Sequence, residues 1–419
     1  MLRNLILQQK EERDFLLSQS YQKRQNSENK QEFLKSPLIK LLTGPRRAGK
    51  SVCALQILKN QNFAYINFDD EQILNNFDED LILQYLLEVY PSFDFLFLDE
   101  IQNVPNWDIW VSKLYRRGIN LFITGSNAKL LSSEMASLLT GRYIQINIMP
   151  FSYKEFADFI NLPSKYNTPK EKANMQIAAN DYLINGGFPE TVKQRSITKD
   201  YLSLLFDSIL LKDVARRYKI RHSDTLYNLA NYLLANFCNP ISFNDLAKDL
   251  DLGSTHTAQK YCRYLSEPYL FYYLPRFNSK LKLMQKAPQK IYVVDNGFVF
   301  ACSFNVSENL GRLLENLVFT ELLRRNFIVG QTIFYYKTKN NREIDFVCRD
   351  KHKVTQLLQV CFDISNEKTR KREIAALLEA AEELHCKNVK IISFEQEFSL
   401  TEKYLQIDVV PVSKWLLNL

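Results

Sequence analysis

The chain has 419 residues, of which 46% are hydrophobic and 24% charged, so it is not a disordered protein and is long enough for several domains. Lys and Arg outnumber Asp and Glu by 54 to 47, an excess compatible with an acidic partner such as nucleic acid and equally with a solvated basic surface. No stretch approaches the roughly 20 apolar residues that span a bilayer, which predicts a protein without a membrane-spanning segment.

Two further features indicate the compartment. The seven cysteines are scattered, with no CxxC motif and no metal-ligand spacing to the four histidines, which is typical of free thiols in a reducing compartment. The N-terminal sequence MLRNLILQQKEERDFLLSQSYQKRQ has too short an apolar run and too many charges for a signal peptide. We therefore expect a soluble cytoplasmic protein.

The N-terminal third of the chain changes pattern at residue 36. Residues 1–35 have the pattern of a charged amphipathic helix, which we expect to pack on the domain that follows. Residues 36–152 alternate short apolar runs with helical stretches, as in an α/β domain with a mostly parallel sheet and βα crossovers. The predicted strands are LIKLLTG, FAYINFDD, FDFLFLDE, NLFITGS and YIQINIMPFS.

The first predicted strand runs into a phosphate-binding pattern, LLTGPRRAGKSV. Gly44 and Gly49 permit the backbone torsions that turn successive amide groups inward, and the helix that follows adds its positive N-terminal end. Lys50 would reach the β and γ phosphates, and the Ser51 hydroxyl would bind magnesium. The pattern predicts ATP and Mg²⁺ as cofactors, with the nucleotide held by Gly44, Pro45, Arg46, Arg47, Ala48, Gly49, Lys50, Ser51 and Val52.

The third predicted strand, FDFLFLDE, stays apolar until Asp99 and Glu100 at its C-terminal end, the edge at which parallel sheets bind ligands. Asp99 has the chemistry of a carboxylate that holds the magnesium shell, and Glu100 that of a base for the attacking water. Two solvated acids at a strand end are the alternative interpretation. Together with the glycine-rich loop upstream, the pair predicts a hydrolase rather than a nucleotide-binding protein alone.

The fourth and fifth strands add further candidates. FITGSN brings Ser126 and Asn127 to the same edge, and one of the two would sense the γ-phosphate or position the water. After a helical stretch, LTGRYIQI places Arg142 just before the fifth strand. An arginine there can act as an arginine finger on the nucleotide of a neighbouring subunit. A surface salt bridge explains Arg142 equally well, so its role and a homo-oligomer both stay open.

These segments together resemble a known family. GPRRAGKS, FLFLDEIQNV, LFITGSNAKLL, LTGRY and MPFSYKEF are similar to the motifs of prokaryotic AAA+ ATPases, in the branch close to the signal-transduction (STAND-like) and archaeal ATPases. YLINGGFPE resembles the lid segment of that family, which implies that Pro189 contacts the nucleotide. The resemblance runs from residue 36 onward and implies a P-loop NTPase core at 36–152, a helical lid at 153–221, a winged-helix domain at 222–300 and a restriction-endonuclease-like α/β domain, related to PD-(D/E)XK nucleases, at 301–419.

The middle of the chain contains a helix-turn-helix pattern, ISFNDLAKDLDLGSTHTAQKYCRYLSEPYLFYYL. A helix at 243–250 meets a turn at 251–253, and a second helix at 254–265 begins with the capping residues Ser254 and Thr255. Because winged helices bind DNA in some proteins and dock on protein in others, DNA binding and packing on the nucleotide site both stay open. The outward face of the second helix carries residue types that contact bases and phosphates: Thr257, Gln259, Lys260 and Arg263.

The C-terminal segment keeps the outline of a nuclease site but changes its chemistry. PD-(D/E)XK nucleases need a helix acid, an Asp at a strand end and Glu-x-Lys on the neighbouring strand, so that carboxylates hold a divalent metal and the Lys supports the attacking hydroxide. Here Gln359, at the position of the glutamate in Glu-x-Lys, carries no charge, and Cys361, at the position of the lysine, carries a thiol. We therefore expect a retained fold without cleavage. The four matching positions are Glu315, Asp345, Gln359 and Cys361. The residues that could supply a migrated cation are Lys337, Lys339 and Arg342.

The sequence therefore predicts magnesium-dependent ATP binding and hydrolysis, coupled to movement of the winged-helix and nuclease-like domains, with DNA as a candidate partner. Two other functions are compatible with the same motifs. One is a slow ATP-dependent switch that signals through protein partners, and the other is an ATP-regulated DNA nuclease.

Overall fold

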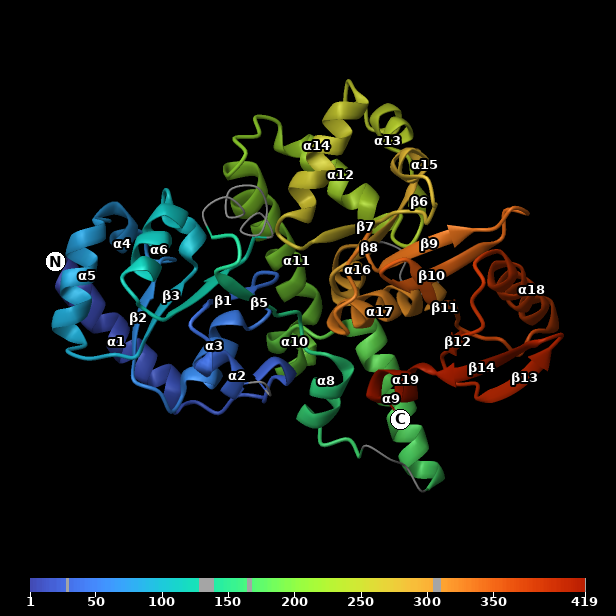
Figure 1. The fold of residues 1–419 in the computed structure, drawn as a ribbon, viewed down its shortest axis with the longest axis horizontal. Coiled ribbons are helices and arrows are strands. Elements are labelled where there is room, and N and C mark those ends of the chain that lie inside the picture. The colour runs from blue at the N-terminus through green and yellow to red at the C-terminus, as the bar shows by residue number, and fades with distance from the viewer. Residues whose placement is uncertain (28–29, 128–138, 164–167, 304–309, 419) are drawn as a thin grey trace. The chain divides into compact units, whose positions relative to one another are not determined.

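The computed structural model describes residues 1–27, 30–127, 139–163, 168–303 and 310–418 (Figure 1). The chain divides into two compact units, one formed by Met1–Pro150 with Glu267–Tyr269 and the other by Phe151–Ser266 with Leu270–Leu419. Within the described residues, no helix is both long enough and apolar enough to cross a membrane. The helix expected between the fourth and fifth strands falls outside the described residues.

The first unit is a parallel sheet with helices on both faces, and its five strands match those expected from the sequence. The strand order is β2-β3-β4-β1-β5, and every pairing is parallel. The C-terminal ends of β3, β4 and β1 therefore lie next to one another at one edge. The strands are β1 (Ile39–Thr43), β2 (Phe63–Asn67), β3 (Phe95–Asp99), β4 (Leu121–Gly125) and β5 (Tyr143–Asn147).

Alternating strand residues divide between two apolar cores, one on each face of the sheet. Leu98 and Ile123 pack with residues of α1, α4, α5 and α6, whereas Phe97 and Phe122 pack with residues of α3. These helices cover the two faces of the sheet. Their bounds are α1 (Leu2–Ser18), α2 (Lys30–Lys35), α3 (Lys50–Leu58), α4 (Glu71–Asn75), α5 (Glu79–Val89) and α6 (Trp107–Arg116), with short 3-10 turns at Gln25–Ser27 (η1) and Ile101–Asn103 (η2).

The N-terminal segment packs on the sheet as expected, but it is not one continuous helix. Helix α1 ends at Ser18, because the apolar repeat stops at Leu17 and a polar stretch follows. Gln9 fastens α1 to β2, the edge strand: its Nε2 donates to the Asn67 carbonyl at 3.0 Å, and its Oε1 accepts from the Asn67 amide at 2.9 Å. The segment thereby covers part of an otherwise open sheet edge.

The second unit begins with a helical layer that contains the segment YLINGGFPE. Gly186 has a φ of 69°, and a Cβ added there would lie 1.7 Å from Asp295 Oδ1. The Gly187 amide donates to Asp295 Oδ2 at 2.9 Å, so the glycine pair closes around a buried carboxylate. The elements of this layer are α8 (Tyr153–Phe159), α9 (Pro169–Asn185), α10 (Pro189–Lys193), η4 (Arg195–Ile197), α11 (Thr198–Ser208), the π-helix η5 (Ile209–Arg216), α12 (Ser223–Ala235) and α16 (Asn296–Cys302).

Two short helices and a small antiparallel sheet follow within this unit. The turn between the two helices contains Asp251 at φ 48° and Gly253 at φ 74°. Strands β7 and β8 pair antiparallel, but a helix occupies their connection and β6 pairs with β8 as a third strand. The elements are β6 (Pro240–Ile241), α13 (Phe243–Asp249), α14 (Thr255–Ser266), β7 (Phe271–Leu274), α15 (Leu281–Lys286) and β8 (Gln289–Val293).

A six-stranded sheet forms the C-terminal part of the unit, in the order β13-β14-β12-β11-β10-β9. Residues of α18 pack in one apolar core with Leu357 and Ile391 of this sheet. The small sheet joins it, because the Phe277 amide donates to the Tyr335 carbonyl at 2.7 Å. The elements are α17 (Leu310–Arg324), β9 (Ile333–Lys337), β10 (Glu343–Asp350), β11 (Lys353–Cys361), α18 (Glu367–Glu383), β12 (Val389–Ser393), β13 (Phe398–Glu402), β14 (Leu405–Pro411) and α19 (Val412–Leu417).

Candidate functional site

The glycine-rich loop connects the end of β1 to the start of α3. Gly44 has a φ of 145°, and a Cβ added there would lie 1.9 Å from the carbonyl oxygen of Ile148, so the site excludes any other residue. Arg47 at φ 65° and Gly49 at φ 92° also adopt left-handed torsions, after which α3 begins at Lys50. The loop thus has the backbone turns that direct amide groups toward an anion at a helix N-terminus.

The two functional residues at the start of α3 lie against the ends of the neighbouring strands. The Lys50 ammonium donates to the Pro45 carbonyl at 3.1 Å and lies 3.6 Å from Glu100 Oε1. The Ser51 hydroxyl donates to Asp99 Oδ1 at 2.8 Å. The sheet therefore brings together residues that are about 50 positions apart in the sequence, as the motifs predicted.

Asp99 is buried and accepts hydrogen bonds from several hydroxyl groups. Besides Ser51, the donors are Thr124 on β4 and Tyr65 on β2, the latter at 3.3 Å. Burial and the neighbouring Glu100 raise the pKa of Asp99 to about 6, although the hydroxyl groups and Lys50 oppose that rise. Bringing a cation to this carboxylate would favour its ionised form.

Glu100 lies next to Asp99 in the sequence but in a different environment. It has a left-handed backbone, with φ 52° and ψ 44°, and its amide donates to the Thr124 hydroxyl at 2.9 Å. Burial would raise the pKa of Glu100, but Lys50, Gln102 and other neighbours outweigh it and hold that pKa below its usual value. A strained backbone and two adjacent acids with opposed pKa shifts are typical of catalytic sites.

The remaining loop residues differ in exposure. Arg46 pairs with Asp69 at 3.5 Å, and Arg47 is exposed to solvent. The Ala48 carbonyl accepts a hydrogen bond from the N-terminal segment, and Val52 is half-buried in the first turn of α3.

At the end of β4, Ser126 and Asn127 are both buried beside this edge. Ser126 Oγ accepts from Gln102 Nε2 at 3.3 Å, which connects it to Glu100.

Arg142 does not lie at this edge. Its carbonyl accepts from the Ile39 amide at 2.9 Å, which places Arg142 at the N-terminal end of the parallel sheet. A strand of this length rises roughly 15 Å, so the guanidinium is far from the loop of its own subunit. The guanidinium lies 5.9 Å from the ring centroid of Tyr115. Its action on a neighbouring subunit stays a prediction, as does a nucleotide contact from Pro189, which begins α10 in the second unit.

Sequence reasoning missed an arginine beneath the loop. Arg24 is only 3% exposed, and its guanidinium donates to the Ala48 carbonyl at 2.7 Å and to the Met149 carbonyl at 2.6 Å. It thus supports the loop from the N-terminal segment. Arg24 stands among Lys and Gln residues in YQKRQN, so the sequence contains no signal that distinguishes it. Tyr65, Gln102 and Thr124 were also missed, since each belongs to a common strand or turn pattern.

The site residues fit magnesium and a nucleoside triphosphate. Ser51 Oγ and the Asp99 carboxylate supply hard oxygen ligands of the kind that magnesium prefers. They lie within hydrogen-bond distance of each other, so both are available to a magnesium ion that takes few ligands from the protein. Lys50 and the loop amides supply the positive field for phosphate. Among the described residues, as their side chains stand in the structure, no group of three or more His, Cys, Asp or Glu could hold a metal ion, so a denser metal centre is not found there.

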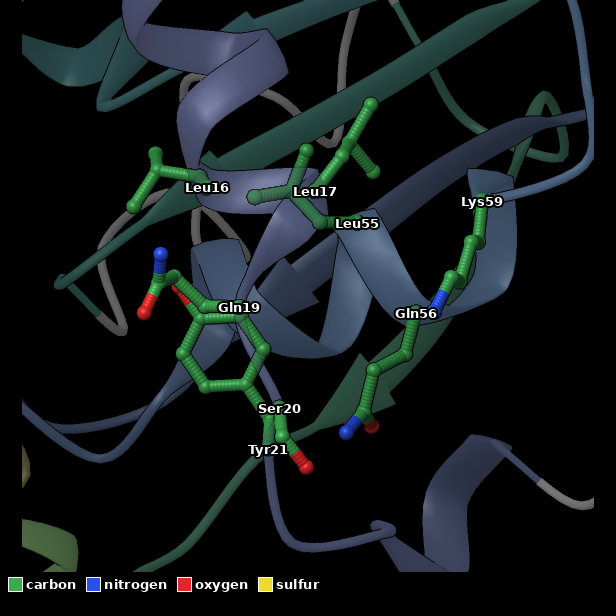
Figure 2. A pocket seen from close by; sticks show the side chains of 8 residues that line it. All are labelled: Leu16, Leu17, Gln19, Ser20, Tyr21, Leu55, Gln56 and Lys59. Carbon is green, nitrogen blue, oxygen red and sulfur yellow. The ribbon is translucent and has the colours of Figure 1, made fainter.

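A separate cavity of about 150 Å³ lies where the end of α1 meets α3 (Figure 2). None of the glycine-rich loop residues lines it, so it is distinct from the phosphate site. It shows that the N-terminal segment does not seal this face of α3. Its lining residues are Leu16, Leu17, Gln19, Ser20, Tyr21, Leu55, Gln56 and Lys59.

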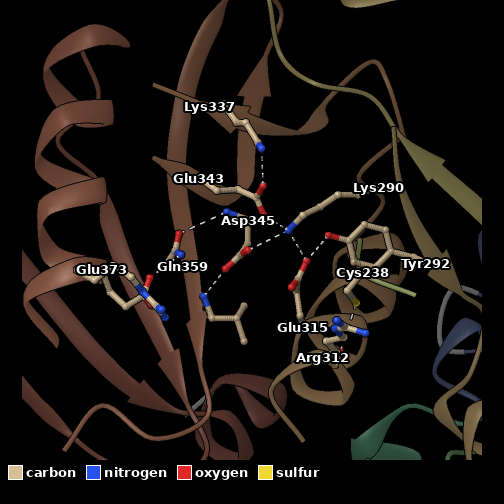
Figure 3. A network of polar contacts seen from close by, with 12 residues as sticks. Cys238, Lys290, Tyr292, Arg312, Glu315, Lys337, Glu343, Asp345, Gln359 and Glu373 are labelled. Carbon is tan, nitrogen blue, oxygen red and sulfur yellow. Dashed lines mark hydrogen bonds and ion pairs between the residues drawn. The ribbon is translucent and has the colours of Figure 1, made fainter. Parts of the chain in front are cut away.

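Three of the four residues matched to a nuclease site, Glu315, Asp345 and Gln359, lie close together in the second unit (Figure 3), and Cys361 ends the strand β11 that carries Gln359. Asp345 Oδ2 accepts from the Val360 amide at 2.9 Å, and Gln359 donates to Glu373 at 2.7 Å. The Cys361 thiol donates to the Asp363 carbonyl at 3.2 Å, and burial with the nearby Glu373 raises its pKa to about 11. The uncharged side chains at the two altered positions are therefore engaged in hydrogen bonds within the fold.

A buried lysine that the sequence did not indicate joins this group. The Lys290 ammonium, from β8, contacts Glu315, Glu343 and Asp345 (Figure 3). Burial alone would lower the pKa of Lys290, but the carboxylates outweigh burial and hold the pKa well above its usual value. Burial and Glu315 raise the pKa of Asp345 to about 8. The group is thus a network of interacting ionisable side chains inside the unit.

Comparison with known proteins places the chain in a family. A model described as an AAA domain matches residues 36–157, and two domains of unknown function, DUF8612 and DUF4143, match residues 177–309 and 310–415. An uncharacterized protein of Methanocaldococcus jannaschii is 38% identical over 399 residues, which cover 91% of this chain and 88% of that protein. The chain belongs to the same family as that protein, and its N-terminal part is an AAA domain. An uncharacterized protein of Haemophilus influenzae is 32% identical, with coverage of 92% and 96%.

Solved structures are similar at a coarser level. The Walker-type ATPase PABY2304 of Pyrococcus abyssi gives a TM-score of 0.44 at 13% identity and covers 69% of this chain and 100% of its own. The Aeropyrum pernix Orc1 protein in complex with DNA gives a TM-score of 0.33 at 10% identity, with coverage of 75% and 98%. Both scores lie below 0.5.

Proposed function

We propose that this AAA-domain protein binds and hydrolyses ATP with magnesium. The observation that carries the proposal is the arrangement of Lys50, Ser51, Asp99 and Glu100 at one edge of the parallel sheet. In this proposal Lys50 binds the terminal phosphates, and Ser51 with Asp99 holds the magnesium ion. The bound magnesium ion neutralises charge that develops on the phosphate oxygens.

Glu100 is the base in this proposal. Its carboxylate is held ionised by Lys50 and Gln102, so it can accept a proton from an attacking water at neutral pH. When Lys50 binds phosphate, its contact with Glu100 would be exchanged for one with the nucleotide. Ser126, joined to Glu100 through Gln102, is then the better of the two β4 candidates for positioning the water.

Loss of nucleotide binding on removal of Lys50 tests the proposal. Lys50→Ala should abolish or strongly weaken ATP binding in calorimetry, because it removes the buried ammonium at the start of α3, which lies beside the Pro45 carbonyl and Glu100. Lys59→Ala is a matched control, since Lys59 is exposed just beyond the same helix. Near-normal affinity in Lys50→Ala, or equal losses in both variants, would remove the basis of the assignment.

We further propose that hydrolysis is coupled to movement of a winged-helix domain that binds double-stranded DNA. A basic segment beside α14 supports DNA as the partner. Tyr218 of that segment stacks on Tyr264 of α14 with ring centroids 3.6 Å apart, and Lys260 lies 5.8 Å from the Tyr264 ring. The cations of the segment are Lys212, Arg216, Arg217, Lys219 and Arg221.

Binding to a DNA duplex at several salt concentrations tests this partner. Each lost phosphate contact should reduce the slope of log affinity against log salt by about 0.9. Arg216→Gln with Lys219→Gln should therefore weaken binding and flatten the slope. The control pair Lys170→Gln with Lys172→Gln, on the exposed start of α9, removes the same charge and should change neither. Equal effects of both pairs, or stimulation of turnover only by a protein partner, would favour the signalling switch instead.

We also propose that the six-stranded sheet keeps a PD-(D/E)XK-like fold without nuclease activity. Gln359 and Cys361 cannot supply the second carboxylate and the ammonium of such a site, and both side chains are engaged in hydrogen bonds within the fold. An ATP-regulated nuclease would need a metal ion beside Asp345, where the Lys290 ammonium lies 3.1 Å away.

A further inference from the structure

Lys290 makes an unusual set of contacts for a lysine in a protein interior. Its side chain is 2% exposed, and its Nζ lies 2.8 Å from Glu315 Oε1, 2.7 Å from Glu343 Oε1 and 3.1 Å from Asp345 Oδ1. Figure 3 shows the three carboxylates pointing at the ammonium from α17 and β10, while the lysine reaches in from β8. One cation is thus surrounded by three acids from elements outside its own sheet.

Neutral donors complete the surroundings of these acids. The Tyr292 hydroxyl donates to Glu315 Oε1 at 2.6 Å, and the Val360 amide donates to Asp345 Oδ2 at 2.9 Å. A second cation, Lys337, lies 3.6 Å from Glu343 Oε2, but it is partly exposed and contacts only that acid. The carboxylates are therefore oriented around one central position, and Lys290 holds it.

We propose that Glu315, Glu343 and Asp345 form a cation site whose occupant is the Lys290 ammonium. Two of these acids, Glu315 and Asp345, are those matched to metal ligands of nucleases, so the lysine stands where a divalent ion would bind. The site holds the small three-stranded sheet to the six-stranded sheet and excludes metal while Lys290 is in place.

Charge and geometry both favour a cation at this position. Several carboxylates buried together repel one another unless a cation lies between them. The oxygen distances of 2.7 to 3.1 Å suit an ammonium donor. Calcium binds oxygen at about 2.3–2.6 Å, so the same oxygens need only a small contraction to hold it once the lysine is removed. Magnesium, with shorter distances of about 2.0–2.1 Å, fits less well.

Removal of the lysine in the full chain tests the proposal. Lys290→Ala leaves space for an ion and its waters, and calorimetry without nucleotide should then show saturable Ca²⁺ binding that the wild type lacks. Added Ca²⁺ should also raise the thermal unfolding midpoint of Lys290→Ala and leave that of the wild type unchanged. Lys337→Ala is the matched control, because it removes a cation from Glu343 without opening the central position, and it should behave as the wild type.

A second variant separates the cation site from a simple loss of packing. Lys290→Ala combined with Glu315→Gln and Glu343→Gln removes the lysine and two of its acids, and it should neither bind Ca²⁺ nor need it for stability. If Lys290→Ala is recovered in folded form only with Ca²⁺ while the triple variant folds without it, the proposal is supported. If Lys290→Ala is folded and binds no Ca²⁺, or if the two variants behave alike, the carboxylates do not form a cation site.

Discussion

The Lys50 ammonium lies 3.6 Å from the Glu100 carboxylate, where the loop after β1 meets the turn after β3. The strand between them in the sheet is β4, and its Thr124 bridges Asp99 and the Glu100 backbone. The candidates for phosphate binding, metal binding and base catalysis, Lys50, Asp99 and Glu100, are therefore parts of one network of hydrogen bonds and an ion pair. The effects of substitutions at two of these residues should therefore not be additive.

The first prediction concerns Arg24. Arg24→Gln removes charge-assisted hydrogen bonds to the Ala48 and Met149 carbonyls, and it should lower the free energy of unfolding by about 1–3 kcal/mol and weaken ATP binding. Chemical denaturation and nucleotide titration measure both effects. Arg3→Gln is the control, because Arg3 makes an exposed ion pair with Glu88. Unchanged ATP affinity in folded Arg24→Gln would show that the N-terminal segment does not support the loop.

Arg24 is also an example of a residue whose function the sequence does not reveal. The strands, the loop and the acids of the first unit could be predicted, because apolar runs and fixed motif spacings are local patterns. The two faces of the sheet follow from the same alternation. Arg24 could not be predicted, since its function depends on a contact with Met149, which is 125 positions away.

The second unit also contains a residue whose position could not be predicted from the sequence. Helices α13 and α14 and the strands β10 and β11 were expected from local patterns. Lys290 was not, because a lysine near the start of a strand normally indicates solvent exposure. Its burial follows only from the position of β8 beside α17 and β10, which is tertiary information.

The second prediction concerns Arg142. If it acts on the nucleotide of a neighbouring subunit, Arg142→Ala should lower turnover by roughly a thousandfold or more and preserve ATP binding. Wild-type activity should then rise faster than linearly with protein concentration. Steady-state rates over a range of concentrations, with molar mass measured in parallel, provide the test. A monomer with full activity would leave Arg142 as a structural residue beside Tyr115.

The third prediction concerns the nuclease-like sheet. The wild-type protein should not cleave DNA or RNA with magnesium or manganese. Gln359→Glu with Cys361→Lys restores the missing residue types, but Lys290 would still occupy the central position, and the new glutamate would face Glu373, only 2.7 Å from the present amide. We therefore expect manganese binding only when Lys290→Ala is added. Metal-dependent cleavage by the wild type that is lost in Asp345→Ala would contradict this account.

The central claim is that Glu100 activates water for ATP hydrolysis, and one pair of measurements on Glu100→Gln tests it most directly. The amide keeps the shape of the side chain but cannot accept the proton, so ATP affinity should stay close to that of the wild type while turnover falls about 100-fold or more. Both are measured on the same preparation, with magnesium present, by nucleotide titration and phosphate release. Turnover equal to that of the wild type, with ATP still bound, would show that Glu100 is not the base and would contradict the mechanism proposed for this site.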